Sequence, residues 1–176
     1  MALSELYLQD RLTRLSIAPE LGGAFSDLLD WADDARDLGV RANADTGEIR
    51  LRRMLGVFTG GRILNQKTAR SQAIGGMIFG IGQALHEEIS TDARDGSFVN
   101  RDLAEYHVPA NLDVPHIDIE FLNDRDPYAN PMQAKGIGEL ACCGTAGAIV
   151  NAIANATGER FRSFPVTLDK VLERLG

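Results

Sequence analysis

Alternating apolar and polar positions predict a β-hairpin near residue 40. Val40–Ala42 and Glu48–Thr59 flank Asp45-Thr46-Gly47, where glycine can adopt the positive φ that a tight turn requires. In the longer strand a mostly apolar face alternates with a mixed one. The apolar face consists of Ile49, Leu51, Arg53, Leu55 and Val57, and the mixed face of Arg50, Arg52, Met54, Gly56 and Phe58. We therefore expect the apolar face to meet the core.

A long helix is predicted to follow, from Asn65 as N-cap to about Ile89, with Thr68 in its first turn. Its interior contains Gly75, Gly76, Gly80 and Gly82. Each interior glycine costs about 1 kcal/mol relative to alanine, so the chain must gain something in return. Either another helix packs closely on this face, as we expect at Gly80 and Gly82, or a flat ligand approaches it.

The rest of the pattern predicts shorter elements. Residues 116–122 alternate as a half-buried strand, Leu140 to about Ala156 forms a small-residue helix that ends at Thr157-Gly158, and residues 161–166 form a short strand. Thr167 is expected to cap a last helix, Leu168–Leu175. Strands and helices alternate, but the hairpin argues against a purely parallel sheet. The pattern therefore indicates an α+β fold, a mixed sheet packed with two small-residue helices.

The first residues read differently from the rest. Residues 1–38 are rich in acidic residues and contain two weakly amphipathic stretches, 4–15 and 23–38. We interpret them as a poorly defined, helical acidic leader, and residues 39–176 as the domain with the informative pattern.

Composition narrows the function classes. The net charge of −7 disfavours nucleic acid or an anionic membrane as a partner. No apolar run reaches the roughly 20 residues that span a bilayer, and no secretory signal is visible near Met1. We expect a cytoplasmic protein, periplasmic only if a partner with a signal carries it. The adjacent Cys142 and Cys143 are expected to be buried, reduced thiols, and the histidines show no metal-ligand spacing.

Lys135-Gly136-Ile137-Gly138-Glu139 is the first candidate for chemistry. Glycine at 136 and 138 permits positive φ and lets main-chain N–H groups approach a bound group. Glu139 then stands before the predicted small-residue helix, where the helix dipole favours a negative charge. Taken alone, Glu139 could simply complement that dipole. The alternative is a carboxylate held beside a ligand.

A second segment strengthens the ligand interpretation. Residues 62–72 read R-I-L-N-Q-K-T-A-R-S-Q and lead into the glycine-rich helix. This segment resembles the cofactor-binding helix entry of the xanthine dehydrogenase and aldehyde oxidase family. In that family's molybdenum-carrying large subunit a K-G-x-G-E turn follows at the spacing seen here between Gln72 and Glu139. Asp102–Pro109, reading D-L-A-E-Y-H-V-P, also resembles the bacterial aldehyde oxidoreductase branch.

The resemblance implies roles for individual residues. Glu139 would be the base in hydroxylation of an aldehyde or N-heterocycle carbon with oxygen from water. Gln72 would lie near the metal end of the cofactor. Without the second motif, we would interpret Gln72 as an ordinary polar helix residue. The main chain of Lys135, Gly136, Ile137 and Gly138 would pass the pterin. The dinucleotide and phosphate part would be held by Arg62, Ile63, Leu64, Asn65, Gln66, Lys67 and Thr68. No side chain would ligate the metal, since the pterin dithiolene does so.

The resemblance also implies a larger assembly. The cofactor would be molybdenum–molybdopterin, in the cytosine dinucleotide form, shared with segments that this chain lacks. The family's large subunit is several times longer, so we expect the remainder of that subunit, or a separate chain supplying it, as a partner. Iron–sulfur and FAD subunits would accept the electrons. Resemblance covers about residues 39–176, which suggests the C-terminal part of such a subunit. The alternative is a truncated, non-catalytic fragment or interaction module that does not bind cofactor alone.

Overall fold

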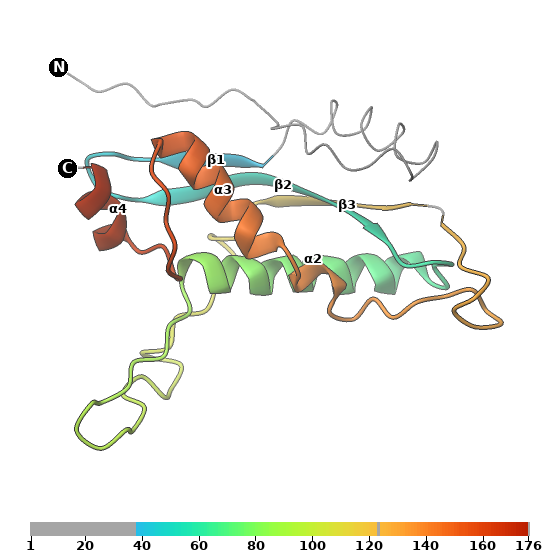
Figure 1. The fold of residues 1–176 in the computed structure, drawn as a ribbon, viewed down its shortest axis with the longest axis horizontal. Coiled ribbons are helices and arrows are strands. Elements are labelled where there is room, and N and C mark those ends of the chain that lie inside the picture. Colours follow the sequence, from blue (N-terminus) through green and yellow to red (C-terminus); the bar gives the residue numbers. More distant parts are fainter. Residues whose placement is uncertain (1–37, 123, 176) are drawn as a thin grey trace.

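The described residues form two layers, a mixed sheet and the helices that cover one of its faces (Figure 1). A computed structural model of the chain describes residues 38–122 and 124–175. The elements are β1 (Gly39–Ala42), β2 (Ile49–Thr59), α2 (Gln66–Leu85), β3 (His116–Leu122), the 3₁₀ helix η2 (Leu140–Cys142), α3 (Thr145–Thr157) and α4 (Leu168–Leu175). This architecture confirms the predicted α+β class. The helices expected over residues 4–15 and 23–38 lie outside the described residues, Leu38 excepted.

The sheet has the strand order β1-β2-β3, with β1 antiparallel and β3 parallel to β2. The predicted hairpin is confirmed. Its turn is held by Asn43, whose Oδ1 accepts hydrogen bonds from the N–H groups of Asp45 and Thr46, while Gly47 adopts a φ of 71°. The parallel strand β3 returns to the sheet after α2 has crossed the face, so β2, α2 and β3 together contribute half of the buried residues of the core cluster.

The predicted core face of β2 is wrong beyond Leu51. Gly39 pairs with Arg53 but Val40 pairs with Leu51, so β2 has one extra residue at this point. Such a bulge shifts the alternation of side chains by one. Ile49 and Leu51 pack towards the core as expected, whereas farther along it is Met54 that is buried.

Helix α2 begins as predicted and ends early. Asn65 is the N-cap, and its Oδ1 accepts from the N–H groups of Lys67 (3.1 Å) and Thr68 (3.2 Å). The helix ends at Leu85, four residues before the predicted end at Ile89. There both His86 and Glu87 donate their main-chain N–H to the carbonyl oxygen of Gly82, which closes the last turn.

The glycines of α2 clear a path for other parts of the chain. A Cβ on Gly80 would lie 2.5 Å from Cβ of Thr145 in α3, and one on Gly76 would lie 3.0 Å from Cβ of Ala141 in η2. The close helix packing expected at Gly80 is therefore confirmed. Gly82 instead meets the side chain of Glu87, and Gly75 faces open space. Packing, not a flat ligand, accounts for the face shared by Gly76 and Gly80.

The small-residue helix predicted from Leu140 is two helices. η2 ends at Cys142, and Gly144, with a φ of 81°, precedes α3. Only glycine adopts that φ without cost, so the chain changes direction there. The stretch Leu140–Thr157 is apolar enough to span a membrane by composition, with a mean hydropathy of 1.3. Its α-helical part, however, has 13 residues, or about 20 Å at 1.5 Å per residue, well short of a bilayer's hydrocarbon core.

The C-terminal segment departs from the prediction in two respects. Residues 161–166 form no strand; the N–H of Val166 donates to Ala84 at the end of α2, and Pro165 has no N–H to offer a neighbouring strand. α4 forms as predicted, but among the described residues no main-chain N–H of the helix bonds the buried Thr167 hydroxyl, which instead lowers the pKa of the Asp169 carboxyl. The thiols also differ from expectation: Cys142 is half-buried and Cys143 is exposed.

One core lies between the sheet and the helices. Met54 and Ile119 face it from the sheet, Met77 and Ile81 from α2, and Ile153 from α3, each at most 4% exposed. α2 thus contacts the sheet on one side and η2 and α3 on another. This arrangement brings the beginning of α2 close to the segment that precedes η2.

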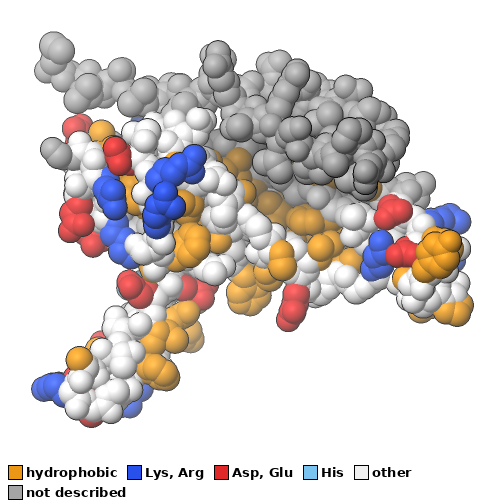
Figure 2. All heavy atoms as spheres, in the orientation of Figure 1, with side chains coloured by type: hydrophobic (Ala, Val, Ile, Leu, Met, Phe, Trp, Pro, Cys, Tyr) orange, Lys and Arg blue, Asp and Glu red, His pale blue; other side chains and the backbone are white. Residues whose placement is uncertain are grey.

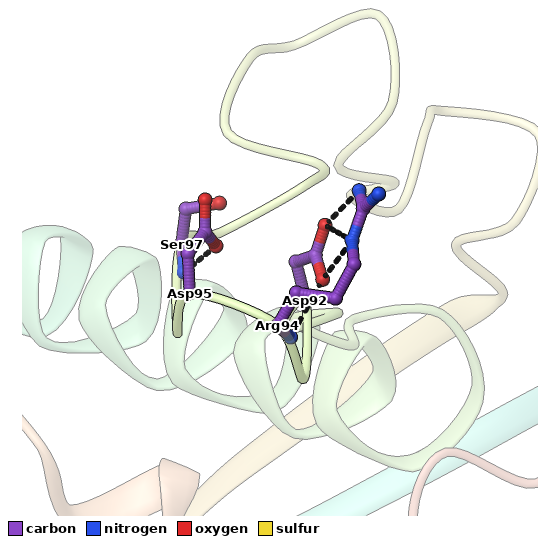
Figure 3. A network of polar contacts seen from close by, with 4 residues as sticks. All are labelled: Asp92, Arg94, Asp95 and Ser97. Carbon is purple, nitrogen blue, oxygen red and sulfur yellow. Dashed lines mark hydrogen bonds and ion pairs between the residues drawn. The ribbon is translucent and has the colours of Figure 1, made fainter.

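Residues 86–115 leave the end of α2 as an extended arm and return at β3 (Figure 1). We call this segment the arm. Its tip is the turn at Asp92–Gly96, where Nε of Arg94 donates to Oδ1 of Asp92 at 3.0 Å (Figure 3). This hydrogen bond is the main cause that lowers the pKa of the Asp92 carboxyl. The arm leaves α2 at the end opposite to its N-terminal residues and to the Lys135–Glu139 turn.

Candidate functional site

A short main-chain pairing joins the two motif segments. Gly61 and Ala134 form an antiparallel bridge, flanked by hydrogen bonds from the N–H of Arg62 to Gln133 (2.7 Å) and from the N–H of Lys135 to Gly60 (2.9 Å). The segment between β2 and α2 thus runs beside the segment that enters the Lys135–Glu139 turn.

The pairing requires particular backbone conformations. Gly61 has a φ of 65° and Gln133 a φ of 58°. A Cβ on Gly61 would lie 2.5 Å from the carbonyl oxygen of Gln133, so only glycine fits. Asn130 supports the other side: its Nδ2 donates to Ala134 (2.6 Å), and its Oδ1 accepts from the N–H groups of Met132 and Ala134. Sequence reasoning missed Asn130, although Asn before Pro131 in a turn-rich loop is a signal for this role.

The amide of Gln72 lies beside the Lys135–Glu139 turn. Its Nε2 is 3.9 Å from the position that a Cβ on Gly138 would occupy, and Gln72 and Gly138 are both exposed. Farther back, Gly60 packs under the side chains of Ile63 and Ile137, which a Cβ there would overlap. The structure therefore brings together the beginning of α2 and the residue directly before Glu139.

The backbone conformation of the two glycines in the turn differs from the prediction of positive φ. Neither Gly136 nor Gly138 has a positive φ. What they provide is open space: a Cβ on Gly136 would have no neighbour within 4 Å, and one on Gly138 would meet only the Gln72 amide. A planar group can therefore approach this main chain without a side chain in the way.

Glu139 does not lie at the beginning of an α-helix, which corrects the expected dipole effect. It precedes only the three-residue η2, makes no side-chain cap, and α3 begins six residues later at Thr145. Its side chain is exposed, and within residues 38–122 and 124–175 no hydrogen bond or ion pair engages its carboxylate. The carboxylate is therefore accessible to a hydrogen bond from a ligand.

The ammonium group of Lys135 is directed to an acidic loop. Its Nζ lies 3.3 Å from Oδ2 of Asp126 and 3.5 Å from Oδ2 of Asp124. The hydrogen bond to Asp126 is the main cause that raises the pKa of Lys135. Lys135 thus anchors the beginning of the turn, and its main chain remains the part that could contact a cofactor.

The residues predicted to bind the dinucleotide are accessible to solvent, but those in α2 lie on two different faces of the helix. Arg62 and residues 64–68 are exposed, and Ile63 is half-buried. The Asn65 cap already accepts hydrogen bonds from the N–H groups of Lys67 and Thr68, so these two groups are not available to a ligand. Thr68 lies one turn before Gln72 on the same face. Gln66 and Lys67 instead line a hollow of about 610 Å³ on the β3 side, together with Arg70 and Ile119.

The donor set matches a pterin better than a bare metal ion. Across the described part of the chain no three His, Cys, Asp or Glu residues gather as metal ligands. The turn instead offers bare main chain at Gly136 and Gly138, one amide and one carboxylate. Main-chain and amide groups provide the donors and acceptors that fix the edges of a polar ring. These residues fit a pterin cofactor, because the main chain at Gly136 and Gly138 is uncovered beside the Gln72 amide.

Sequence comparison agrees with this chemistry. Residues 38–115 match the family model of a molybdopterin cofactor-binding domain. The chain is 55% identical over 136 residues to the aldehyde oxidoreductase molybdenum-binding subunit PaoC of Escherichia coli, covering 77% of this chain and 19% of that protein. It is 35% identical to a putative xanthine dehydrogenase molybdenum-binding subunit, XdhA, of Escherichia coli, covering 72% of this chain and 17% of that protein.

Solved structures share the fold. Quinoline 2-oxidoreductase from Pseudomonas putida superimposes with a TM-score of 0.72 at 29% identity, over 77% of this chain and 17% of that one. The aldehyde oxidoreductase from Desulfovibrio desulfuricans gives a TM-score of 0.67 at 30% identity, over 76% of this chain and 14% of that one. Fold and sequence similarity thus define a molybdopterin cofactor-binding domain. The chain belongs to the xanthine dehydrogenase and aldehyde oxidase family, as a part of its molybdopterin-binding subunit, and spans about a fifth of the length of these curated relatives.

Proposed function

We propose that this chain contributes the proton-accepting group and part of the cofactor surface to a molybdenum-dependent aldehyde oxidoreductase. When bound, the molybdopterin cofactor would supply the oxidising metal for hydroxylation of an aldehyde carbon, or an N-heterocycle carbon, with oxygen from water. The single observation that carries the proposal is the exposed, unengaged carboxylate of Glu139 directly after Gly138, which itself lies beside the Gln72 amide.

Glu139 is the base in this proposal. As the oxygen of water attacks the substrate carbon it must lose a proton, and a carboxylate within hydrogen-bonding distance can accept it. Because no described residue engages the Glu139 side chain, binding a substrate and water there breaks no existing ion pair. The main chain of Lys135, Gly136, Ile137 and Gly138 would contact the pterin, with the Gln72 amide near its metal end.

Arg62, Ile63, Leu64, Asn65, Gln66, Lys67 and Thr68 would hold the dinucleotide part, in the cytosine form that the bacterial branch suggests. The exposure of most of this segment supports that role. The division of the segment between two faces of α2 suggests that Thr68 faces the pterin side while Lys67 faces the hollow near β3. We further propose that iron–sulfur and FAD subunits accept the electrons, as the resemblance implies.

The substitution Glu139→Gln tests the base. The variant keeps the size and hydrogen-bonding geometry but not the proton affinity. In the complex co-expressed with its genomic neighbours we expect turnover of an aromatic aldehyde to fall by about 10²–10⁴-fold, with molybdenum content unchanged. Glu173→Gln, an exposed glutamate in α4, is the matched control and should keep full turnover. Unchanged turnover in Glu139→Gln would refute the assignment.

One observation favours a second candidate, a non-catalytic fragment or interaction module. The chain spans about a fifth of its relatives, so much of a relative's cofactor surroundings has no counterpart here. Metal analysis of the purified chain alone, beside the co-expressed complex, separates the two. The first proposal expects no stoichiometric molybdenum in the chain alone and stoichiometric metal in the complex. Absence of metal from both would favour the second candidate.

A further inference from the structure

The arm carries large apolar side chains on a well-ordered hydrogen-bonded frame. Asn100 Nδ2 donates to the carbonyl oxygen of Glu88 (2.6 Å), while the N–H of Ser90 donates to Oδ1 of Asn100 (2.8 Å) and that of Val99 to the carbonyl oxygen of Ser90 (2.9 Å). The returning segment of the arm is tied to Glu87, two residues after α2, by Tyr106, whose hydroxyl donates to Oε2 of Glu87 at 2.9 Å. The arm's shape is therefore defined by its own polar contacts.

On this frame the apolar side chains are left exposed. Ile89 is 55% exposed, Phe98 56% and Leu103 88%, and with Tyr106 they line a hollow of about 360 Å³. Figure 2 shows apolar side chains gathered on one side of the arm where it leaves the body of the molecule. We call this surface the arm hollow. Apolar clusters of this kind on an ordered surface mark interaction sites, because covering them removes apolar area from water.

The charged residues at the rim of the arm hollow indicate which class of partner covers it. Arg101 and Asp102 stand side by side at its edge, so both signs of charge border an apolar centre. A lipid surface or nucleic acid would favour a basic rim, and the chain's net charge is −7. An apolar centre with a mixed polar rim is the usual anatomy of a protein–protein contact.

We propose that the arm hollow is the docking surface for the remaining part of a molybdopterin-binding subunit. The matched cofactor-binding domain, residues 38–115, includes the whole arm. The relative PaoC is about five times as long as the 136 residues that it shares with this chain. In this proposal, the part of such a relative that has no match in this chain is the protein surface that covers the hollow. The identity of this occupant rests on the proposed function; the position of the surface does not.

Capture of a truncated relative tests the surface without metal or turnover. The probe is the Escherichia coli PaoC subunit with the region that matches this chain removed, co-expressed with the full 176-residue chain carrying an affinity tag. The unmodified chain should retain the probe, and Leu103→Asp should reduce the retained amount at least ten-fold. Phe98→Asp is a second variant with the same expectation. Leu112→Asp is the matched control, because Leu112 is 84% exposed but lies outside the hollow, and it should retain the probe fully.

The outcomes separate this proposal from its alternatives. Equal capture by Leu103→Asp and the unmodified chain, loss in all three variants, or no capture at all would overturn it. A second result would also overturn the proposal: analytical ultracentrifugation shows a dimer of the unmodified chain, and Leu103→Asp abolishes that dimer. A second copy of the chain would then occupy the hollow. Circular dichroism and thermal unfolding of each variant check that folding is preserved. Retained capture with an inactive Glu139→Gln complex would support the surface, and an active Glu139→Gln complex with retained capture would refute only the proposed base.

Discussion

Arg70 of α2 donates a hydrogen bond from Nη1 to the carbonyl oxygen of Ile119 in β3, at 2.8 Å. Its Nη2 also lies 3.3 Å from Oδ1 of Asp118. Since residues 70 and 72 lie about 200° apart around the helix, Arg70 faces the sheet while Gln72 faces the Lys135–Glu139 turn. The Arg70 contact therefore adds to the core packing of α2 in holding the rotation that presents the Gln72 amide.

Removing this contact should cost stability. We expect Arg70→Met to lower the free energy of unfolding by about 1–2 kcal/mol, because a hydrogen bond from a charged group to a part-buried carbonyl is lost. Asp118→Asn should cost less than about 1 kcal/mol, since it leaves the bond to Ile119 intact and removes only an exposed ion pair. Urea unfolding followed by circular dichroism measures both. Equal losses in the two variants would contradict the primary role of the Ile119 bond.

The helix contact at Gly80 predicts opposite effects for two alanine substitutions in α2. Gly80→Ala should destabilise by about 1–3 kcal/mol, because the new methyl group would meet Thr145 at 2.5 Å. Gly75→Ala should stabilise by up to about 1 kcal/mol, because its methyl group enters open space and improves helix propensity. Thermal and urea unfolding of both variants check the sign. A stabilising Gly80→Ala would show that α2 and α3 are not in close contact.

The Lys135 ion pair predicts the titration of Asp126. The N–H of Tyr128 and then the ammonium of Lys135 lower the pKa of the Asp126 carboxyl from its usual value of 3.8. A lowered folded-state pKa means that Asp126 stabilises the fold above pH 3.8, and that this contribution is lost as the pH falls through the folded-state pKa. Lys135→Met should raise the pKa of Asp126 only part of the way, since the larger cause remains.

Carboxyl-carbon NMR titration of the full chain measures that shift. Asp92, whose pKa is lowered by Arg94 in the arm, serves as an internal control and should not move in Lys135→Met. An unchanged pKa of Asp126 in the variant would show that Lys135 makes no effective ion pair with it.

The elements predicted correctly are those that short-range patterns determine. The Asn43–Gly47 turn and the Asn65 cap each depend on one side chain bonding to main chain within three residues, which a sequence displays directly. The family resemblance rested on two separated segments, and both lie in the region where the fold brings them together. The juxtaposition of Gln72 and Gly138, in contrast, needs the Gly61–Ala134 bridge, which no local pattern encodes.

The errors share a physical cause, because each feature is decided by a distant neighbour. The bulge near Arg52 arises from pairing with β1, and it reverses which face of β2 is buried. The break at Gly144 allows η2 to pack on Gly76 while α3 packs on Gly80. Residues 161–166 have the composition of a strand but, among residues 38–122 and 124–175, find only Ala84 as a main-chain partner. In each case a tertiary contact overrides the secondary-structure preference of the local sequence.

The arm has a practical consequence for engineering. It departs from α2 after Leu85, about 20 Å along the helix axis from Gln72 at 1.5 Å per residue. Its tip at residues 93–96 is exposed, and the nearby hairpin closes through its own polar contacts (Figure 3). A fluorescent reporter or epitope spliced into this tip would extend into solvent, leaving the glycine-lined turn unaltered and providing a handle for following assembly in cells.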